Sequence, residues 1–494
     1  MRARRGPEPT GVVEVVLDDA PADPAYGPRD GPPPAGDDAD GAPLADEAPG
    51  HRRGRRRLRA LGGVAAAAAL ALVVGANVAE VRADRARDAR LAGQPGVVAS
   101  LAEPVQERWR VEGWLAADLG HHVLLDTPDG LRAVDPVTGA VAWGLDRDAR
   151  AGSEYCRPST DGAGWADGPG LEADLLVCVP YSETAGARDG EHELLVLDAR
   201  TGERRHVLAA SGGLLGVEWT PTSVAVLLTT PEGTLHVVAW DPRTGEQLVD
   251  TTTRAQAFSA TTPGSGALGW ERRGDVVLIT GDVGAAAVDL VTGAEVDPLD
   301  ATAATSDAWE SALPDGSTAV WTWDAEGGRG HVVGADGTRR FALPAPPLAP
   351  WVDDGAVPEV LVVADEDGLA ALDVRTGDVR WTAELGFASA LVAVDGVLVL
   401  AHGTRTLGVD LRSGATLWEV ASAGSGYPAG VTDGELVLLT ETGEDGRGST
   451  LVARTVAHGE EAWRVAVDGP AWGLTSVGGG RLLLATDTAV VGLG

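Results

Sequence analysis

The stretch Leu131-Arg-Ala-Val-Asp-Pro-Val-Thr-Gly-Ala-Val-Ala-Trp143 recurs, with variations, at intervals of roughly forty residues down to the C-terminus. Its first half predicts the end of a strand, and the residues from Asp135 to Gly139 predict a tight hairpin turn. The Asp135 carboxylate and the Thr138 hydroxyl can accept hydrogen bonds from N–H groups of the turn, and Gly139 can adopt a positive φ. Trp143, on the returning strand, offers a large flat surface to a neighbouring unit.

The repeat occurs in strong, weak and frayed copies. Strong copies contain Ala371, Asp373, Thr376, Gly377 and Trp381, and Gly408, Asp410, Ser413, Gly414 and Trp418. Weaker copies have turns at Asp198/Thr201/Gly202, Asp241/Thr244/Gly245 and Asp289/Thr292/Gly293, with His206, Val249 and Asp297 at the Trp position. Frayed copies lie at 334–338, leading to Phe341, and at 454–463 with Gly459. A period of this length indicates an array of similar units.

The pattern Ala-x-Asp-x-x-Thr-Gly-x-x-x-Trp resembles the blade signature of the quinoprotein-type β-propellers, whose units are called pyrroloquinoline-quinone-like repeats. The resemblance covers roughly residues 100–494 and implies an all-β fold of four-stranded blades arranged in a ring. The 15 Trp and 67 Gly of the chain fit repeated packing residues and tight turns. We count about nine units. Because eight is the common number in this family, we expect about eight blades, within a range of seven to nine.

The two ends of the repeat region complement each other. The last unit ends at 489–493 without a Trp strand, whereas the region begins with a lone strand that contains Trp109. We therefore predict that this N-terminal strand completes the last blade. The ends of the array would then be joined, with no unpaired sheet edge between them.

The net charge of the chain is confined to the repeat region. The chain has 39 Lys and Arg against 73 Asp and Glu, a formal charge of −34. Within residues 1–90 the charges balance, because Arg residues at 51–59 and 80–90 offset an acidic tail at 1–50. The excess negative charge after residue 90 argues against nucleic acid or an anionic membrane surface as a partner of that region. A soluble acidic surface without a specific partner is the favoured explanation of the charge.

The first hundred residues are expected to anchor the chain in a membrane. Residues 1–50 are rich in Pro, Gly, Ala and acids, so we expect a disordered cytoplasmic tail. A basic juxtamembrane segment at 51–59 precedes 60–79, which lacks charged residues and would span about 30 Å as a transmembrane helix. Residues 80–103 are expected to form a charged stalk and linker, and 104–494 the propeller.

Two interpretations of the apolar segment compete. The small residues near Ala79 and Ala83 fit a signal peptide that is cleaved there, whereas an uncleaved segment would be a permanent anchor. We favour the anchor because nearly sixty residues precede the segment, far more than in secretory signals. Six Arg before it, and a nearly balanced mixture of Arg and acidic residues after it, predict a cytoplasmic N-terminus and a single-pass protein with an extracytoplasmic propeller.

The chain has two cysteines, Cys156 in a Gly- and Pro-rich loop and Cys178 in a predicted strand. In an extracytoplasmic region such a pair is expected to form a disulfide. Closing a loop of about twenty residues would add roughly 3 kcal/mol of stability. If the topology were inverted, both would be free thiols. A metal site is not favoured, because no second Cys or His lies at ligand spacing.

The sequence provides no recognisable catalytic set. The resemblance implies relatives that hold a quinone beside a disulfide of adjacent cysteines, with a stacking Trp and calcium ligands; the separated cysteines of this chain exclude that feature, and we expect no cofactor. The chain has no Lys, which indicates a GC-rich, actinobacterial type of genome and excludes a phosphate-binding loop ending in Gly-Lys-Ser/Thr. We find neither a Gly-x-Ser-x-Gly nor a His-Glu-x-x-His motif. The scattered histidines include His121, His122, His331, His402 and His458.

Three functions fit these observations. The first is a membrane-anchored, non-enzymatic scaffold that binds a protein or a cell-envelope component; the resemblance supports it, because the family includes the propeller subunit of outer-membrane protein assembly. The second is a quinone-dependent dehydrogenase-like enzyme, and the third a sensor that acts through a partner of the cytoplasmic tail. We favour the scaffold, with a cationic partner that binds irregular loops at 146–174, 181–192 and 440–450.

Overall fold

A computed structural model describes residue 82 and residues 84–146, 154–159, 173–180, 190–259, 269–298, 307–313, 315–324, 327–422, 430–442 and 448–494. All of them belong to one compact unit, Ala76–Gly494. The expected tail and the apolar segment at 60–79 lie outside the described residues. In the part that is described, no helix is long and apolar enough to cross a membrane.

The described residues form an all-β fold with nine sheets, most of them four-stranded and antiparallel. The first five are β2–β5 (Trp114–Asp118, Val123–Thr127, Gly130–Val134, Val141–Asp146), β6–β9 (Glu154–Pro158, Leu175–Pro180, Glu191–Asp198, Arg204–Ser211), β10–β13 (Gly213–Trp219, Val224–Thr229, Thr234–Trp240, Gln247–Gln256), β14–β17 (Gly269–Arg273, Val276–Thr280, Ala285–Asp289, Glu295–Val296) and β18–β21 (Asp307–Ala312, Thr318–Asp324, Gly327–Val333, Arg339–Leu343).

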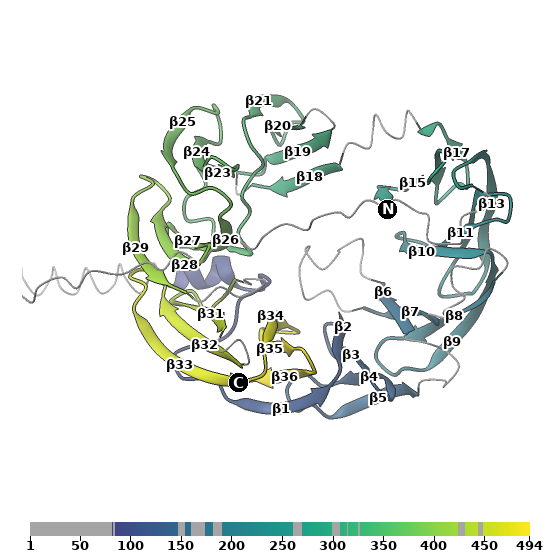
Figure 1. Cartoon of the computed structure of the whole chain (residues 1–494), viewed down its shortest axis with the longest axis horizontal. Coiled ribbons are helices and arrows are strands. Elements are labelled where there is room, and N and C mark those ends of the chain that lie inside the picture. Colours follow the sequence, from purple (N-terminus) through teal and green to yellow (C-terminus); the bar gives the residue numbers. More distant parts are fainter. Residues whose placement is uncertain are drawn as a thin grey trace, which may run out of the picture. The chain divides into compact units, whose positions relative to one another are not determined.

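The other four sheets include two departures from four strands. They are β23–β25 (Val360–Ala364, Leu369–Asp373, Val379–Ala383), β26–β29 (Ser389–Val394, Val397–His402, Arg405–Asp410, Thr416–Ala421) with β22 (Val352–Asp353) beside β26, β30–β33 (Val431–Thr432, Leu436–Thr442, Gly448–Thr455, Glu461–Asp468), and β34–β36 (Ala471–Val477, Arg481–Thr486, Ala489–Leu493) with β1 (Glu107–Glu112). The sheets follow one another in chain order around an axis (Figure 1), as in a β-propeller.

One extended segment explains both departures. Pro346 and Leu348 exchange backbone hydrogen bonds with the β23 strand, so they occupy the missing innermost place of that sheet. The chain then continues into β22, which pairs in parallel with β26 of the next sheet. The segment therefore crosses between two blades, and the array has nine blades among the described residues, at the upper end of the range expected from sequence.

The predicted closure of the array is confirmed. β1 pairs antiparallel with β36, and Trp109 lies opposite Gly492. The Trp109 ring packs on Gly139 of the first blade, and its Nε1 donates a hydrogen bond to the Pro136 carbonyl at 3.1 Å. The strand that opens the repeat region thus completes the last blade, and its Trp109 side chain contacts the first blade. No sheet edge is left unpaired between the two ends of the array.

The same interlock recurs between other blades. The Nε1 of Trp143 donates to the Ala199 carbonyl of the following blade at 3.1 Å, and its ring packs on Gly202. Where Trp is replaced by His206, the imidazole Nε2 contacts the Arg243 carbonyl at 2.9 Å in the same way. Where Trp, His or Phe holds this position, its ring covers a turn glycine of the following blade, and only a residue without Cβ leaves room for the ring.

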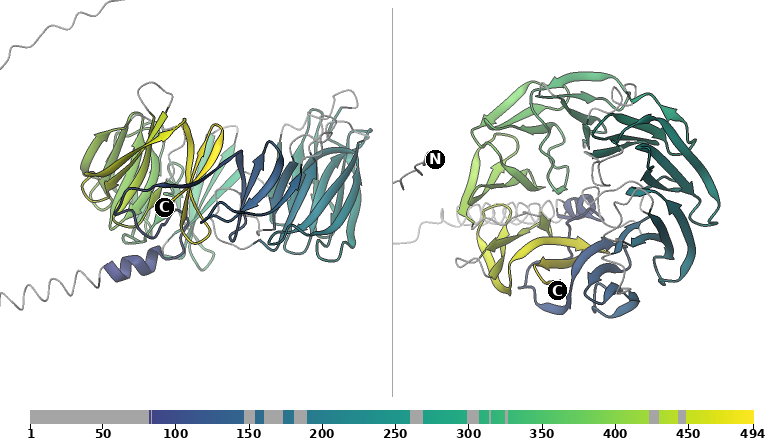
Figure 2. Two further views of the ribbon diagram at one scale, coloured as in Figure 1. Left: turned by 90° about the horizontal axis from the view of Figure 1, so that it is seen from below. Right: turned by 45° about the vertical axis from the view of Figure 1, so that its right-hand side comes forward.

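The antiparallel order gives the array two faces. Turns after the first and third strand of a blade lie on one face, which we call the turn face; the remaining connections lie on the other. The residues expected to form a stalk include a helix over 84–91 that packs on the turn face. Figure 2 shows it beside the strands. Leu91 is only 2% exposed, and Arg87 Nη1 donates to Asp395 Oδ2 at 3.0 Å.

The linker after this helix continues along the turn face. The backbone of Val98 donates to the Thr432 carbonyl at 2.9 Å, and the Trp463 Nε1 donates to the Leu101 carbonyl at 2.6 Å. The last blade has no turn between its third and fourth strands, because its fourth strand is β1. Leu101 therefore supplies the carbonyl that the turn of a following blade offers elsewhere.

Candidate functional site

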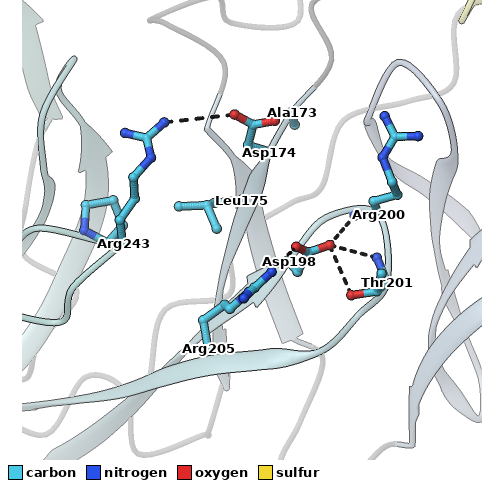
Figure 3. Close-up of a pocket in the computed structure, with 9 residues that line it drawn as sticks. Ala173, Asp174, Leu175, Asp198, Arg200, Thr201, Arg205 and Arg243 are labelled. Carbon is cyan, nitrogen blue, oxygen red and sulfur yellow. Dashed lines mark hydrogen bonds and ion pairs between the residues drawn. The ribbon is translucent and has the colours of Figure 1, made fainter.

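A cavity of about 360 Å³ opens on the turn face between the blades β6–β9 and β10–β13 (Figure 3). Three arginines and two aspartates contribute to its lining, which consists of Ala173, Asp174, Leu175, Asp198, Arg200, Thr201, Arg205, Pro242 and Arg243. They come from the residues before β7, the turn between β8 and β9, the start of β9, and the turn between β12 and β13. The lining thus carries a formal charge of +1 in a chain of −34.

Asp198 organises one wall of the cavity. Its Oδ1 accepts hydrogen bonds from the backbone N–H groups of Arg200 and Thr201 at 3.1 and 2.9 Å, and from the Thr201 hydroxyl at 3.0 Å. Its Oδ2 accepts a bond from Arg205 Nη2 at 2.6 Å. The Arg205 bond, followed by those of the turn, lowers the pKa of Asp198 to about 2. The repeat turn therefore holds a carboxylate that is charged at neutral pH and that binds Arg205 at the wall of the cavity.

Arg243 forms the opposite wall. Its backbone N–H donates to Asp241 Oδ1 at 2.7 Å, so the turn between β12 and β13 fixes its position. The side chain is 69% exposed, and its Nη2 lies 3.9 Å from Asp174 Oδ2, on a side chain that is 82% exposed. An ion pair at this distance in solvent contributes little, because water screens the charges.

A second cluster lies at the turn between β2 and β3. The Asp118 Oδ2 and both ring nitrogens of His121 are buried, and within the described residues they have no hydrogen-bond partner. The His121 and His122 ring centroids lie 4.7 Å apart. Burial raises the pKa of Asp118, and burial together with the neighbouring His121 lowers the pKa of His122. No group of three His, Cys, Asp or Glu residues among those described is arranged to hold a metal ion.

The predicted disulfide is confirmed. Cys156 on β6 lies opposite Cys178 on β7, and the two are bonded with their Cα atoms 4.0 Å apart. The prediction of a loop throughout 146–174 is wrong, because β6 forms the innermost strand of its blade there. In the same way, the expected loop at 440–450 is shortened by β31 and β32. The remainder of these loops, and most of 181–192, lies outside the described residues.

The repeat residues named from the sequence are used in turns and between blades. Asp135 Oδ1 accepts bonds from the backbone N–H groups of Val137 and Thr138, both at 2.8 Å. The corresponding carboxylates Asp373 and Asp410 accept bonds from their own turns, and the rings of Trp381 and Trp418 pack on Gly414 and Gly459 of the following blades. The sequence argument named Asp198 only as a turn residue and did not single out Arg205 or Arg243. The Arg residues beside the repeat turns were the signal that could have identified the cavity.

Comparisons with known proteins concern the fold. No sequence family matches the chain. No curated protein matches it either. One similar solved structure is BamB from Moraxella catarrhalis, with 19% sequence identity, coverage of 79% of this chain and 98% of that chain, and a TM-score of 0.34. A europium-containing methanol dehydrogenase has 14% identity, covers 82% of this chain and 88% of its own, and gives a TM-score of 0.35. The Dos1 propeller has 9% identity, covers 80% of this chain and 96% of its own, and gives a TM-score of 0.39. These similarities carry no information about activity.

Proposed function

We propose that this chain is a membrane-anchored, extracytoplasmic β-propeller that binds a protein or a cell-envelope component without turning it over. The observation that supports a binding role is the interlocked ring. The recognisable repeat residues build turns and contacts between blades, and β1 joins the last blade to the first. A rigid frame of this kind holds exposed turns and loops in fixed positions, which is how propellers present binding surfaces.

The disulfide supports the extracytoplasmic location. Disulfides persist in oxidising compartments and are rare in the cytosol. Cys156 and Cys178 are bonded within one blade, as expected for a domain that is exported. The positive segment at 51–59 before the apolar residues 60–79 supports a cytoplasmic N-terminus.

Topology and binding are tested separately. External protease added to intact spheroplasts should digest the propeller and leave the N-terminal tail protected; protection of the propeller would refute the proposed orientation. In-cell crosslinking of the full chain, with identification of the captured proteins, should yield the same partner in repeated experiments. This partner should not be captured from cells whose chain lacks the propeller. Oxidation of an alcohol or sugar by the purified chain with added quinone and calcium would overturn the non-enzymatic role.

A further inference from the structure

The arginine cavity has a structural counterpart elsewhere in the ring. In the blade β23–β25, Asp373 takes the place of Asp198, and Arg380 takes the place of Arg205 seven residues later. The distance from Arg Nη2 to Asp Oδ2 is 2.6 Å at both sites. The hydrogen bond from the arginine is the main cause that lowers the pKa of each aspartate to about 2. The following blade supplies an arginine from its own repeat turn at both sites, Arg243 in one and Arg412 in the other.

The two sites differ in one carboxylate. Glu359 and Asp174 hold the same backbone position, because each carbonyl accepts a bond from the residue after the turn aspartate, at 3.2 and 3.0 Å. Glu359 Oε1 lies 4.0 Å from Arg380 Nη1 and 3.8 Å from Arg412 Nε, so it bridges both arginines. Asp174 is shorter by one methylene. Among the described residues it pairs with Arg243 at 3.9 Å but not with Arg205.

The carboxylate position is also used in a third blade. The Glu435 carbonyl accepts the corresponding bond from Val456 at 2.9 Å, and its side chain contacts Arg87 of the docked helix at 3.5 Å. At this position, Glu359 and Glu435 therefore each form an ion pair with arginines of the same chain. At Asp174 the equivalent space is the 360 Å³ cavity.

We propose that this cavity binds a carboxylate of a ligand between Arg205 and Arg243, in the place that the Glu359 side chain occupies between Arg380 and Arg412. Guanidinium groups suit a carboxylate because it offers two oxygens to paired N–H donors, and Asp198 already holds the Arg205 guanidinium in place. The charge of −34 repels a polyanion, so the carboxylate belongs to a neutral or cationic partner. The inference rests on the proposed binding role only in assigning this carboxylate to a partner.

The test uses the full chain in membranes and arginine modification by phenylglyoxal, read for each residue by mass spectrometry. The probes are N-acetyl-aspartate N-methylamide, which carries a side-chain carboxylate, and N-acetylglycine, which carries a terminal one. Inorganic phosphate and chloride at equal ionic strength are the comparison anions. We expect a saturating carboxylate probe to slow modification of Arg205 and Arg243 about threefold to fivefold, while Arg412 is unaffected. The more protective probe identifies the source of the carboxylate.

Two reciprocal variants control the experiment. Asp174→Glu should bridge Arg205 and Arg243 internally, so that Arg243 reacts slowly without probe and the probe has no further effect. Glu359→Asp should open the counterpart site, so that Arg412 becomes more reactive and sensitive to the probe. Equal protection of all arginines, protection by phosphate alone, or unchanged reactivity in both variants would overturn the inference.

The outcome is separable from the proposed function. If Arg243→Gln leaves capture of a crosslinked partner intact and the probes fail to protect the cavity, the binding role stands and the carboxylate site is lost. If the probes protect the cavity but no partner is ever captured, the site stands and the scaffold role fails.

Discussion

The interlock between blades predicts a large effect of adding one methyl group at Gly202. This residue has a φ of +69°, and a Cβ built on it would lie 2.6 Å from Trp143 Cδ2 of the preceding blade. An L-residue in the left-handed region costs about 1 kcal/mol. Forcing a side chain into a packed contact costs about 1–3 kcal/mol more. We therefore expect Gly202→Ala to lower the free energy of unfolding by about 2–4 kcal/mol.

The chain provides a matched control at Gly337. It lies in a turn at the same face with a φ of +78°, but a Cβ there would meet no atom within 4 Å. Gly337→Ala should therefore cost only the backbone strain, about 1 kcal/mol. The measurement is urea unfolding monitored by tryptophan fluorescence. The two variants are compared with the same dependence of unfolding free energy on urea concentration. Pairing Gly202→Ala with Trp143→Ala should show coupling, because the smaller side chain removes the collision.

Equal destabilisation by Gly202→Ala and Gly337→Ala would refute the packing argument, since backbone strain alone would then explain both. Additive effects of Gly202→Ala and Trp143→Ala would also contradict the packing argument, because additivity would show that the two side chains do not collide.

Three further predictions concern other contacts. Trp463→Phe keeps an aromatic ring but removes the donor to the Leu101 carbonyl, so it should cost about 1 kcal/mol and speed proteolysis of the linker at 94–105; an unchanged cleavage rate would contradict this. Because Asp198 has its pKa lowered to about 2, the stability it contributes is present above pH 4 and is lost as the pH falls toward 2. Asp198→Asn should therefore reduce the loss of unfolding free energy between pH 4 and pH 2 by roughly 1 kcal/mol after allowance for solvent screening, and an unaltered pH profile would argue against the Arg205 pair. Reduction of the bond between Cys156 and Cys178 should raise the mass by two hydrogen atoms and destabilise the fold by roughly 3 kcal/mol; no mass change would mean that the thiols are already free.

The local chemistry of the repeat could be predicted from its residues alone. The residues from Asp135 to Gly139 specify their turn because all of its hydrogen bonds join atoms within a few residues. Trp109 predicted closure, because an unpaired strand at one end matched a missing strand at the other. The disulfide could also be predicted from the sequence, because the chain has only two cysteines. These features depend on contacts between residues close in sequence, or on a strand or cysteine for which the chain has a single possible partner.

Features that depend on contacts between distant segments became evident only in the fold. Residues 346–353 cross from the edge of β23 to the edge of β26, a pairing that no local pattern specifies. The helix over 84–91 lies against the turn face because charges on Asp395 and Glu435, hundreds of residues away, face Arg87. The carboxylate cavity is the clearest case. Arg205 follows one repeat turn, and Arg243 lies within the next. The length of one side chain at position 174 decides whether the space between them is filled, because only a carboxylate that reaches both guanidinium groups can bridge them.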